Sequence, residues 1–240
     1  MRVVSFTPIK LNNERTPGKN TKNFTDGYPL IHYILSTLKQ CNELNETYVY
    51  CSRDEIKDYL IPGVNYLKRD EIYDTAQANI NDMFYSFSCK VDADIYVVAH
   101  ATAPFLKSET IDKGIRAVKS GEYDSAVAVR KVQEFMWSAN KPMNYNPEHI
   151  PRTQDLEPYY EETTGLYIFN REVIQKLHRR IGKKEFMIEV TPIESIDINN
   201  PVDFDIADAI NYFDTHVRKI RGGGYRLIAY YSASKIGEVA

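Results

Sequence analysis

The sequence has little of what several protein classes need. Its three cysteines, Cys41, Cys51 and Cys89, lack the paired CxxC spacing of a zinc or redox site. We therefore expect them to be small buried hydrophobes in a reducing compartment. Lys and Arg number 30 against 33 Asp and Glu, which gives a formal net charge of −3. Because no basic excess exists to neutralise a phosphate backbone, nucleic acid is not an expected partner.

Long apolar segments are missing as well. Nowhere do eighteen apolar residues run together, and MRVVSFTP at the start lacks a cationic region followed by an apolar stretch. We therefore expect no membrane span and no secretion signal, and a cytoplasmic location. The rest of the composition, 43% hydrophobic and 26% charged, is that of a globular protein, and 240 residues suffice for one α/β domain.

Short β-rich runs alternate with helical patterns along most of the chain. This alternation predicts an α/β fold with a mostly parallel, Rossmann-like sheet flanked by helices. The expected strands lie at residues 3–6, 47–52, 64–67, 94–101, 125–129, 165–169 and 195–198.

Two helices are predicted most clearly. Residues 29–40 place five apolar side chains on one helical face. A second helix should begin after Asn200, a good N-cap, with Pro201 at its first position and the acids Asp203 and Asp205 in its first turn. Its inward stripe is expected to consist of Ile206, Ile210 and Phe213.

Residues 140–162 interrupt the regular pattern. They show no periodicity and contain four prolines, which predicts an insertion that projects from the sheet as a lid or a dimerisation arm. Its tyrosines Tyr145, Tyr159 and Tyr160 are candidate anchors in a homodimer. We expect one α/β domain over residues 1–214 and leave the structure of the tail, residues 215–240, open.

The most informative segment is TPIKLNNERTPGKN, residues 7–20, which follows the first expected strand directly. The carboxyl end of such a strand is where open α/β sheets bind their ligands. The segment lacks the GxxxxGK[ST] spacing of a Walker loop. Its three cations and three amides can instead surround a triphosphate, unless they are only a solvated surface with a plain Pro-Gly turn. These six residues are Lys10, Asn12, Asn13, Arg15, Lys19 and Asn20.

The 7–20 segment resembles the signature IPARxxSKxxPxKN of the acylneuraminate (CMP-sialic acid) cytidylyltransferases. Lys10 aligns with its arginine, Asn13 with its serine, and Lys19 and Asn20 with its closing pair. A lysine keeps the charge of an arginine but loses its planar fork. The resemblance implies a fold of the nucleotide-diphospho-sugar transferase type. It also implies nucleotide binding by Lys10, Asn13, Arg15, Lys19 and Asn20.

Further segments resemble the same family in the same order, so that the likeness covers about residues 2–213. YLKRDEI would place Arg69 near the nucleotide, and HATAPF would place His100 and Thr102 at the substrate, although a lone histidine is more often structural. An Arg-x-Gln run would turn Arg152 and Gln154 toward the acidic sugar, since an arginine fork matches a carboxylate. The alternative for Arg152 is a surface ion pair with a neighbouring acid.

The segment ESIDINN resembles the metal-binding IDID of the family. Asp197 matches the first aspartate, and Asn199 replaces the second with a neutral ligand. Magnesium prefers a few hard oxygens with water and phosphate at the remaining positions, so Asp197 and Asn199 are the expected Mg²⁺ ligands. The alternative is that Asp197 only caps the following helix.

The resemblance implies transfer of CMP from CTP to an acidic, sialic-acid-like nonulosonic sugar, with release of pyrophosphate. Positioning and charge neutralisation would carry catalysis, with Lys10, Lys19 and Asp197 as catalytic residues and no identifiable general base. Two alternatives stay open. One is a nucleotide-sugar-related transferase of another sugar class, and the other is a non-catalytic nucleotide- or sugar-binding homologue, suggested by Lys10 and Asn199.

Overall fold

The computed structural model describes residues 1–75 and 77–217. Its main sheet has seven strands in the order β3-β2-β1-β4-β8-β5-β9. Within that sheet β8 runs antiparallel to both neighbours, and the other pairs are parallel, which confirms the mostly parallel α/β fold. The strands are β1 (Val3–Ile9), β2 (Glu46–Cys51), β3 (Asn65–Lys68), β4 (Ile95–Ala99), β5 (Ser125–Val132), β8 (Tyr159–Asn170) and β9 (Glu185–Glu189).

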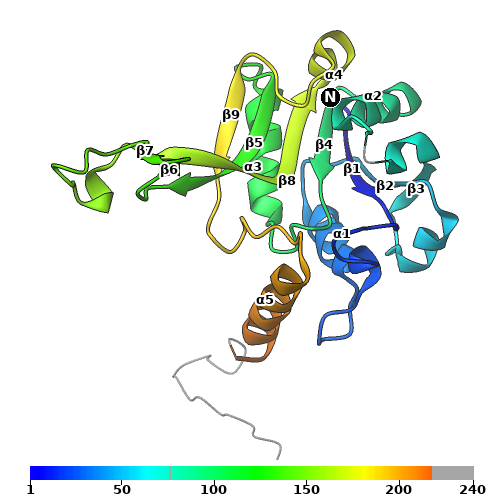
Figure 1. The fold of residues 1–240 in the computed structure, drawn as a ribbon. Coiled ribbons are helices and arrows are strands. Elements are labelled where there is room, and N and C mark those ends of the chain that lie inside the picture. The colour runs from blue at the N-terminus through cyan, green and yellow to red at the C-terminus, as the bar shows by residue number, and fades with distance from the viewer. Residues whose placement is uncertain (76, 218–240) are drawn as a thin grey trace, which may run out of the picture.

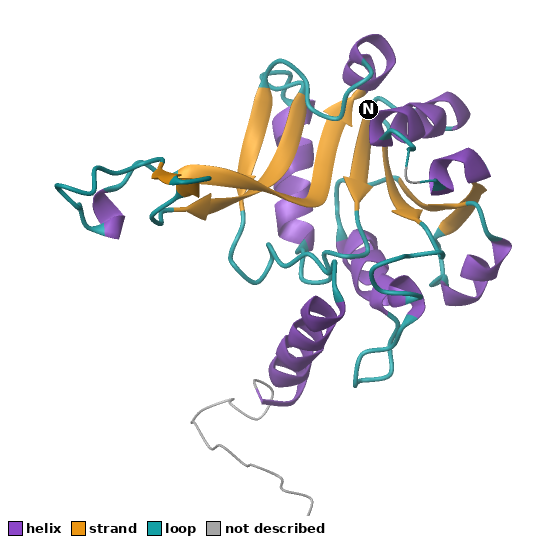
Figure 2. Ribbon diagram, viewed as in Figure 1, coloured by secondary structure: helices purple, strands orange, loops and turns teal. Residues whose placement is uncertain are grey.

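Helices cover both faces of this sheet (Figure 2). The apolar sides of α1 and α3 pack on one face, and those of α2 and α4 pack on the other. Because successive strand residues point to opposite faces, β1 contributes Val3 to the first core and Val4 to the second. The helices are α1 (Leu30–Gln40), α2 (Ile80–Lys90), α3 (Ser108–Lys119), α4 (Arg171–Leu177) and α5 (Pro201–Tyr212). Short 3₁₀ helices lie at Lys19–Thr21, Asp54–Tyr59, Glu71–Asp74 and Thr153–Asp155, and a π-helical turn lies at Phe213–Val217.

A long hairpin arm projects from the sheet (Figure 1). It forms because β5 and β8 continue to pair beyond the core, up to Val132 opposite Tyr159, after a register shift between Val127 and Val129. Its outer part holds the short strands β6 (Trp137–Ser138) and β7 (Lys141–Pro142). The predicted projecting insertion is therefore confirmed, although its base lies in β5, several residues before position 140. Its role as a lid or dimer arm stays a prediction.

The predicted strand at residues 195–198 is wrong. The seventh strand is instead β9, which lies at the edge of the sheet and begins and ends with a glutamate. Ile188 is its one buried side chain. Residues 197–200 form an extended loop in which Ile198 is buried against Phe24, Leu30 and Phe204. Its alternating pattern mimics a strand because one isoleucine fills this small third core.

The final helix begins as predicted but turns a different face inward. Asn200 and Asp203 form a capping box and Pro201 is the first helical residue. The buried side chains are Phe204, Ala207 and Asn211, whereas Ile206 and Phe213 are 51% and 41% exposed. The expected inward stripe is therefore wrong for Ile206 and Phe213, and Ile210 is half-buried.

The structure also bears on three other expectations, which concern the cysteines, membrane spans and the tail. Of the cysteines, Cys51 is buried, Cys41 is half-buried and Cys89 is exposed, so the expectation of burial is wrong for Cys89. None of the described helices combines the length and apolarity needed to cross a membrane. In the expected tail, residues 218–240 lie outside the described part of the chain.

Candidate active site

The site lies at the edge of the sheet where the parallel strands β1 and β4 end, on the side occupied by α5 (Figure 1). A central cavity of about 240 Å³ opens there between the 7–20 segment, the loop after β4 and the loop before α5. Ligands of open α/β sheets bind at this kind of edge. The cavity is lined by Pro8, Lys10, Asn13, Lys19, Asn20, His100, Ala101, Thr102, Thr164, Asp197 and Asn199.

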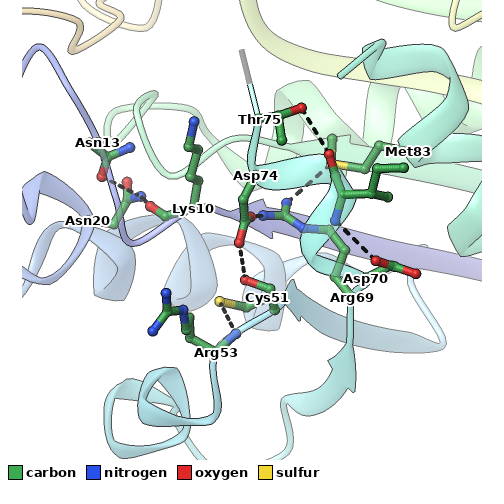
Figure 3. Close-up of polar contacts among 12 residues, drawn as sticks. Lys10, Asn13, Asn20, Cys51, Arg53, Arg69, Asp70, Asp74, Thr75 and Met83 are labelled. Carbon is green, nitrogen blue, oxygen red and sulfur yellow. Dashed lines mark hydrogen bonds and ion pairs between the residues drawn. The ribbon is translucent and has the colours of Figure 1, made fainter. Parts of the chain in front are cut away.

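The 7–20 segment is folded by its own polar side chains. Gly18 has a φ of +67°, which a glycine adopts without strain, and it begins the turn Lys19–Thr21. Asn20, which is buried, donates from Nδ2 to the carbonyl oxygen of Lys10 at 3.0 Å and to Oδ1 of Asn13 at 3.5 Å (Figure 3). Asn20 therefore acts as an internal brace that holds Lys10 and Asn13 at the cavity.

Lys19 is a buried cation, with 8% of its surface exposed. Its Nζ donates to the carbonyl oxygen of Ile198 at 2.6 Å, which ties the 7–20 segment to the loop before α5. Burial lowers the pKa of the ammonium group, the nearby Asp197 opposes this effect and Arg15 adds to it. The positive charge thus stands beside the carboxylate, where a phosphate oxygen would find both a charge and a donor.

A chain of hydrogen bonds connects Asp197 to Arg15. Nη2 of Arg15 donates to Oδ1 of Asn199 at 2.6 Å, and Nδ2 of Asn199 donates to Oδ2 of Asp197 at 2.5 Å. The same carboxylate oxygen accepts from Oγ1 of Thr164 at 3.0 Å. Thr164 has a φ of +56°, an uncommon conformation for a β-branched residue. Strain of this kind accumulates at functional sites, and here it accompanies the contact between the Thr164 hydroxyl and Asp197.

His100 is a neutral imidazole at this edge. Burial lowers its pKa to about 4, although Asp197 pulls the pKa upward, and Arg180 and Lys19 lower it further. Its Nε2 is buried and has no hydrogen-bond partner among the residues that the structure describes. The backbone N–H of His100 donates to the carbonyl oxygen of Gly165 at 3.0 Å, which fixes the start of the loop. His100 lines the central cavity, and a buried polar atom without a partner calls for an explanation, of which a hydrogen bond to a ligand is one.

Two further cavities adjoin the central one. A large cavity of about 530 Å³ lies along β8 and contains Arg15, Arg130, Glu161 and Glu162 in its lining, together with Thr164 and Asp197. An outer cavity of about 320 Å³ is lined by Lys10, Asn13, Glu14, Arg15, Thr16, Lys19 and Asn199. Asn199 lines all three, so it lies at their junction.

The residues that β5 and β8 supply to the large cavity were not predicted from the sequence. Arg130 donates to Oε2 of Glu161 at 2.6 Å across these strands, and Arg180 donates to Oε2 of Glu162 at 3.1 Å. The alternation along a strand could have placed neighbouring residues of β8 on opposite faces. It could not have shown that this stretch borders the loop before α5.

The structure brings most of the predicted site residues together. Lys10, Asn13, Lys19, Asn20, His100, Thr102, Asp197 and Asn199 surround the central cavity, and Arg15 lines the two adjoining cavities.

The remaining three predicted residues, Arg69, Arg152 and Gln154, line none of these cavities. Arg69 is 3% exposed and forms an ion pair with Asp74 (Figure 3). Arg152 and Gln154 lie in the arm, where Arg152 forms the exposed ion pair with Asp155 that was its alternative interpretation. Their contact with nucleotide or sugar stays a prediction.

The two expected metal ligands differ in their fit to magnesium. Asp197 uses Oδ2 for both of its side-chain hydrogen bonds, so Oδ1 remains for a cation, and magnesium commonly takes one carboxylate with substrate phosphates. The oxygen of Asn199 is instead bonded to Arg15, so Asn199 does not fit as a ligand in this arrangement. Among residues 1–75 and 77–217, no group of three or more acidic, His or Cys side chains is placed to hold a metal.

The known proteins that this chain resembles include cytidylyltransferases. The family model described as cytidylyltransferase matches residues 8–232. N-acylneuraminate cytidylyltransferase A of Danio rerio is 27% identical over 202 residues, which are 80% of this chain and 46% of that protein. The chain therefore spans about half the length of this curated relative. The 3-deoxy-manno-octulosonate cytidylyltransferase of Acaryochloris marina is 22% identical over 219 residues, 82% of each chain.

Solved structures share the fold. A CMP:2-keto-3-deoxy-manno-octonic acid synthetase complexed with CTP superposes with a TM-score of 0.69 at 15% identity, covering 89% of this chain and 100% of that one. The 4-diphosphocytidyl-2C-methyl-D-erythritol synthase of Anaerococcus prevotii gives a TM-score of 0.63 at 11% identity, covering 88% and 96%.

Proposed function

Given that the chain belongs to the cytidylyltransferase family, we propose that it transfers CMP from CTP to a sugar acid of the sialic-acid type and releases pyrophosphate. The observation that carries the proposal is the central cavity, where Lys10, Lys19 and Asp197 line one space at the ligand-binding edge of the sheet. A relative of this fold was solved with CTP. The relatives named for acylneuraminate and for octulosonate both act on sugar acids, and the sequence resemblance favours the former.

The reaction needs neutralisation of charge and alignment more than covalent chemistry. The anomeric hydroxyl oxygen of the sugar attacks the α-phosphorus, the bond from that phosphorus to the pyrophosphate oxygen breaks, and the hydroxyl proton passes to solvent. In the proposal, Lys10, Arg15 and Lys19 surround the triphosphate, and Asn13 and Asn20 hold the 7–20 segment around it. Such fixed cations stabilise the charge that grows on the leaving group.

Magnesium is the proposed cofactor, held by Asp197 through its free carboxylate oxygen and by the triphosphate. When bound, it would neutralise phosphate charge and polarise the α-phosphate. Asn199 is not part of this proposal, because its oxygen is bonded to Arg15.

The sugar is proposed to occupy the large cavity, which adjoins the central one at Thr164 and Asp197. With Arg15 on the triphosphate, Arg130 is the cation in its lining that is left for a sugar carboxylate. The neutral His100 lines the central cavity, where a sugar hydroxyl that extends from the large cavity would meet it. Arg152 and Gln154 are far along the arm, so their proposed contact with sugar needs the arm of a second protomer. A homodimer is therefore part of the proposal.

The test measures pyrophosphate release with each of the four ribonucleoside triphosphates and with N-acetylneuraminate, 3-deoxy-manno-octulosonate, a neutral hexose or a hexose 1-phosphate as acceptor. We expect release with CTP and a sugar acid, and loss of release in Asp197→Ala. Turnover with the hexose 1-phosphate alone would instead favour a transferase of another sugar class. CTP binding without turnover on any acceptor would favour a non-catalytic homologue.

A further inference from the structure

Arg15 and Asn199 form a hydrogen bond with each other. The roles expected for them, in nucleotide binding and in metal binding, did not predict this contact. They are 184 positions apart, and Nη2 of Arg15 lies 2.6 Å from Oδ1 of Asn199. Asn199 lies at the junction of the three cavities, and Arg15 lines two of them. The amide is itself fixed, because its Nδ2 is bonded to Asp197 and its backbone N–H to Oδ2 of Asp203 at 2.9 Å. A rigid acceptor therefore holds an otherwise exposed guanidinium at the junction.

We propose that Asn199 is a positioning residue for Arg15. The arginine so placed supplies the positive charge beside the triphosphate that a metal ion bound to residue 199 would otherwise supply. This inference rests on the proposed function, because it takes the ligand to be a nucleoside triphosphate. It replaces the sequence-based role of Asn199 as a metal ligand.

The chemistry of the amide explains why asparagine suits this role. A carboxylate at position 199 would bind the guanidinium as an ion pair and cancel its charge. An amide oxygen accepts the hydrogen bond without adding negative charge, so the cation keeps its attraction for phosphate. The bond uses one of the five N–H donors of arginine, and the planar fork offers the others to phosphate oxygens.

The surrounding charges are consistent with this assignment. Arg15 is close enough to Lys19 to lower the pKa of its ammonium group. Two cations held near each other repel in the free protein, and an anion of high charge relieves that repulsion when it binds. Lys10, Arg15 and Lys19 line the outer cavity together, so a triphosphate there would meet three cations without a metal held by Asn199.

The experiment is a double-mutant cycle on CTP affinity, measured by calorimetry in EDTA. We expect wild type to bind CTP without metal, and Asn199→Ala and Arg15→Gln each to weaken binding by about tenfold, which is 1.4 kcal/mol. Because both changes remove the same placed cation, Arg15→Gln/Asn199→Ala should bind no more weakly than Arg15→Gln alone. Arg116→Gln, which removes a charge from the distant helix α3, is the matched control and should bind like wild type.

The outcomes separate the two proposals. If wild type does not bind CTP at all, the proposed function and this inference both fail. If wild type binds CTP and Asn199→Ala binds equally well in EDTA, only the inference fails. A loss in Asn199→Ala that appears only with Mg²⁺ and is unchanged by Arg15→Gln would restore Asn199 as a metal ligand. Circular dichroism melts check that each variant is folded, and Arg15→Gln, at an exposed position, still tests the charge if Asn199→Ala is unstable.

A second measurement uses Mn²⁺ binding, followed by electron paramagnetic resonance. In Asn199→Asp the new carboxylate should pair with Arg15, so Mn²⁺ affinity in the presence of CTP should stay within about threefold of wild type. In Arg15→Gln/Asn199→Asp the carboxylate is released and Mn²⁺ affinity should rise by about tenfold. Tighter Mn²⁺ binding by Asn199→Asp alone would contradict the inference.

Discussion

Replacing His100 with glutamine should change how the stability of the protein depends on pH. Burial lowers the pKa of His100 from 6.5 to about 4, and the sign of the effect on stability follows from this direction. Below pH 6.5 the unfolded chain takes up a proton at this imidazole, whereas the folded protein does so only near pH 4. The contribution of the neutral imidazole is therefore fully present above pH 6.5 and is lost as the pH falls toward 4.

The size of this contribution follows from the shift of the pKa. One pKa unit corresponds to 1.36 kcal/mol, so the free energy of unfolding should fall by about 2 kcal/mol at pH 5 and about 3 kcal/mol at pH 4 on account of His100. Glutamine has a comparable polar end and does not titrate. The stability of His100→Gln should therefore fall less steeply with acid than that of wild type.

The assay is urea unfolding followed by circular dichroism at pH 7, 6, 5 and 4.5, because the difference between wild type and variant cancels the carboxylates that both contain. His149→Gln is the matched control, since His149 is exposed on the arm and should leave the profile of wild type unchanged. A constant difference between wild type and His100→Gln at all four values would refute the burial argument.

Three other changes test the site and the arm. Lys19→Met removes the ammonium group that donates to Ile198, so the free energy of unfolding in denaturant should fall by about 1–2 kcal/mol. Its CTP affinity, measured by calorimetry, should fall at least tenfold. Unchanged affinity would contradict the role of Lys19 in phosphate binding. Gly165→Ala would place its Cβ 2.6 Å from Cβ of Ala103, so the loop after β4 must shift. The free energy of unfolding should fall by about 1–3 kcal/mol in the same assay, and CTP binding should weaken. Sedimentation should give twice the 27.7 kDa of one chain, and Trp137→Glu, on the exposed arm, should shift the mass to one chain. A wild type that sediments as 27.7 kDa would rule out the dimer.

The elements that the sequence predicted well are those whose pattern has one explanation. The helix at residues 29–40 has an apolar stripe that suits only a helix packed on a sheet, and the structure has α1 there. The pattern at 195–198 has two explanations, a strand or a loop with one buried isoleucine, and the second holds. The edge strand β9 shows a weak signal, because one of its five side chains is buried.

The candidate site was predictable where its residues follow strands. Residues 10–20 and His100 come directly after β1 and β4, and parallel strands bring their carboxyl ends to one edge. The bond between Arg15 and Asn199 joins two loops far apart in sequence, and loop side chains have no periodicity that fixes their direction. Local spacing therefore identified both residues but not the role that one has for the other.

Thr164 shows that the protein gives up stability for the geometry of this site. Its left-handed backbone costs on the order of 1–3 kcal/mol, a conformation that glycine would adopt without strain. Glycine, however, has no hydroxyl to donate to Asp197. Selection for thermal stability alone would therefore favour glycine at position 164. Selection for a fixed orientation of the Asp197 carboxylate favours threonine. The threonine at this position marks the compromise between a more durable fold and a better-ordered site.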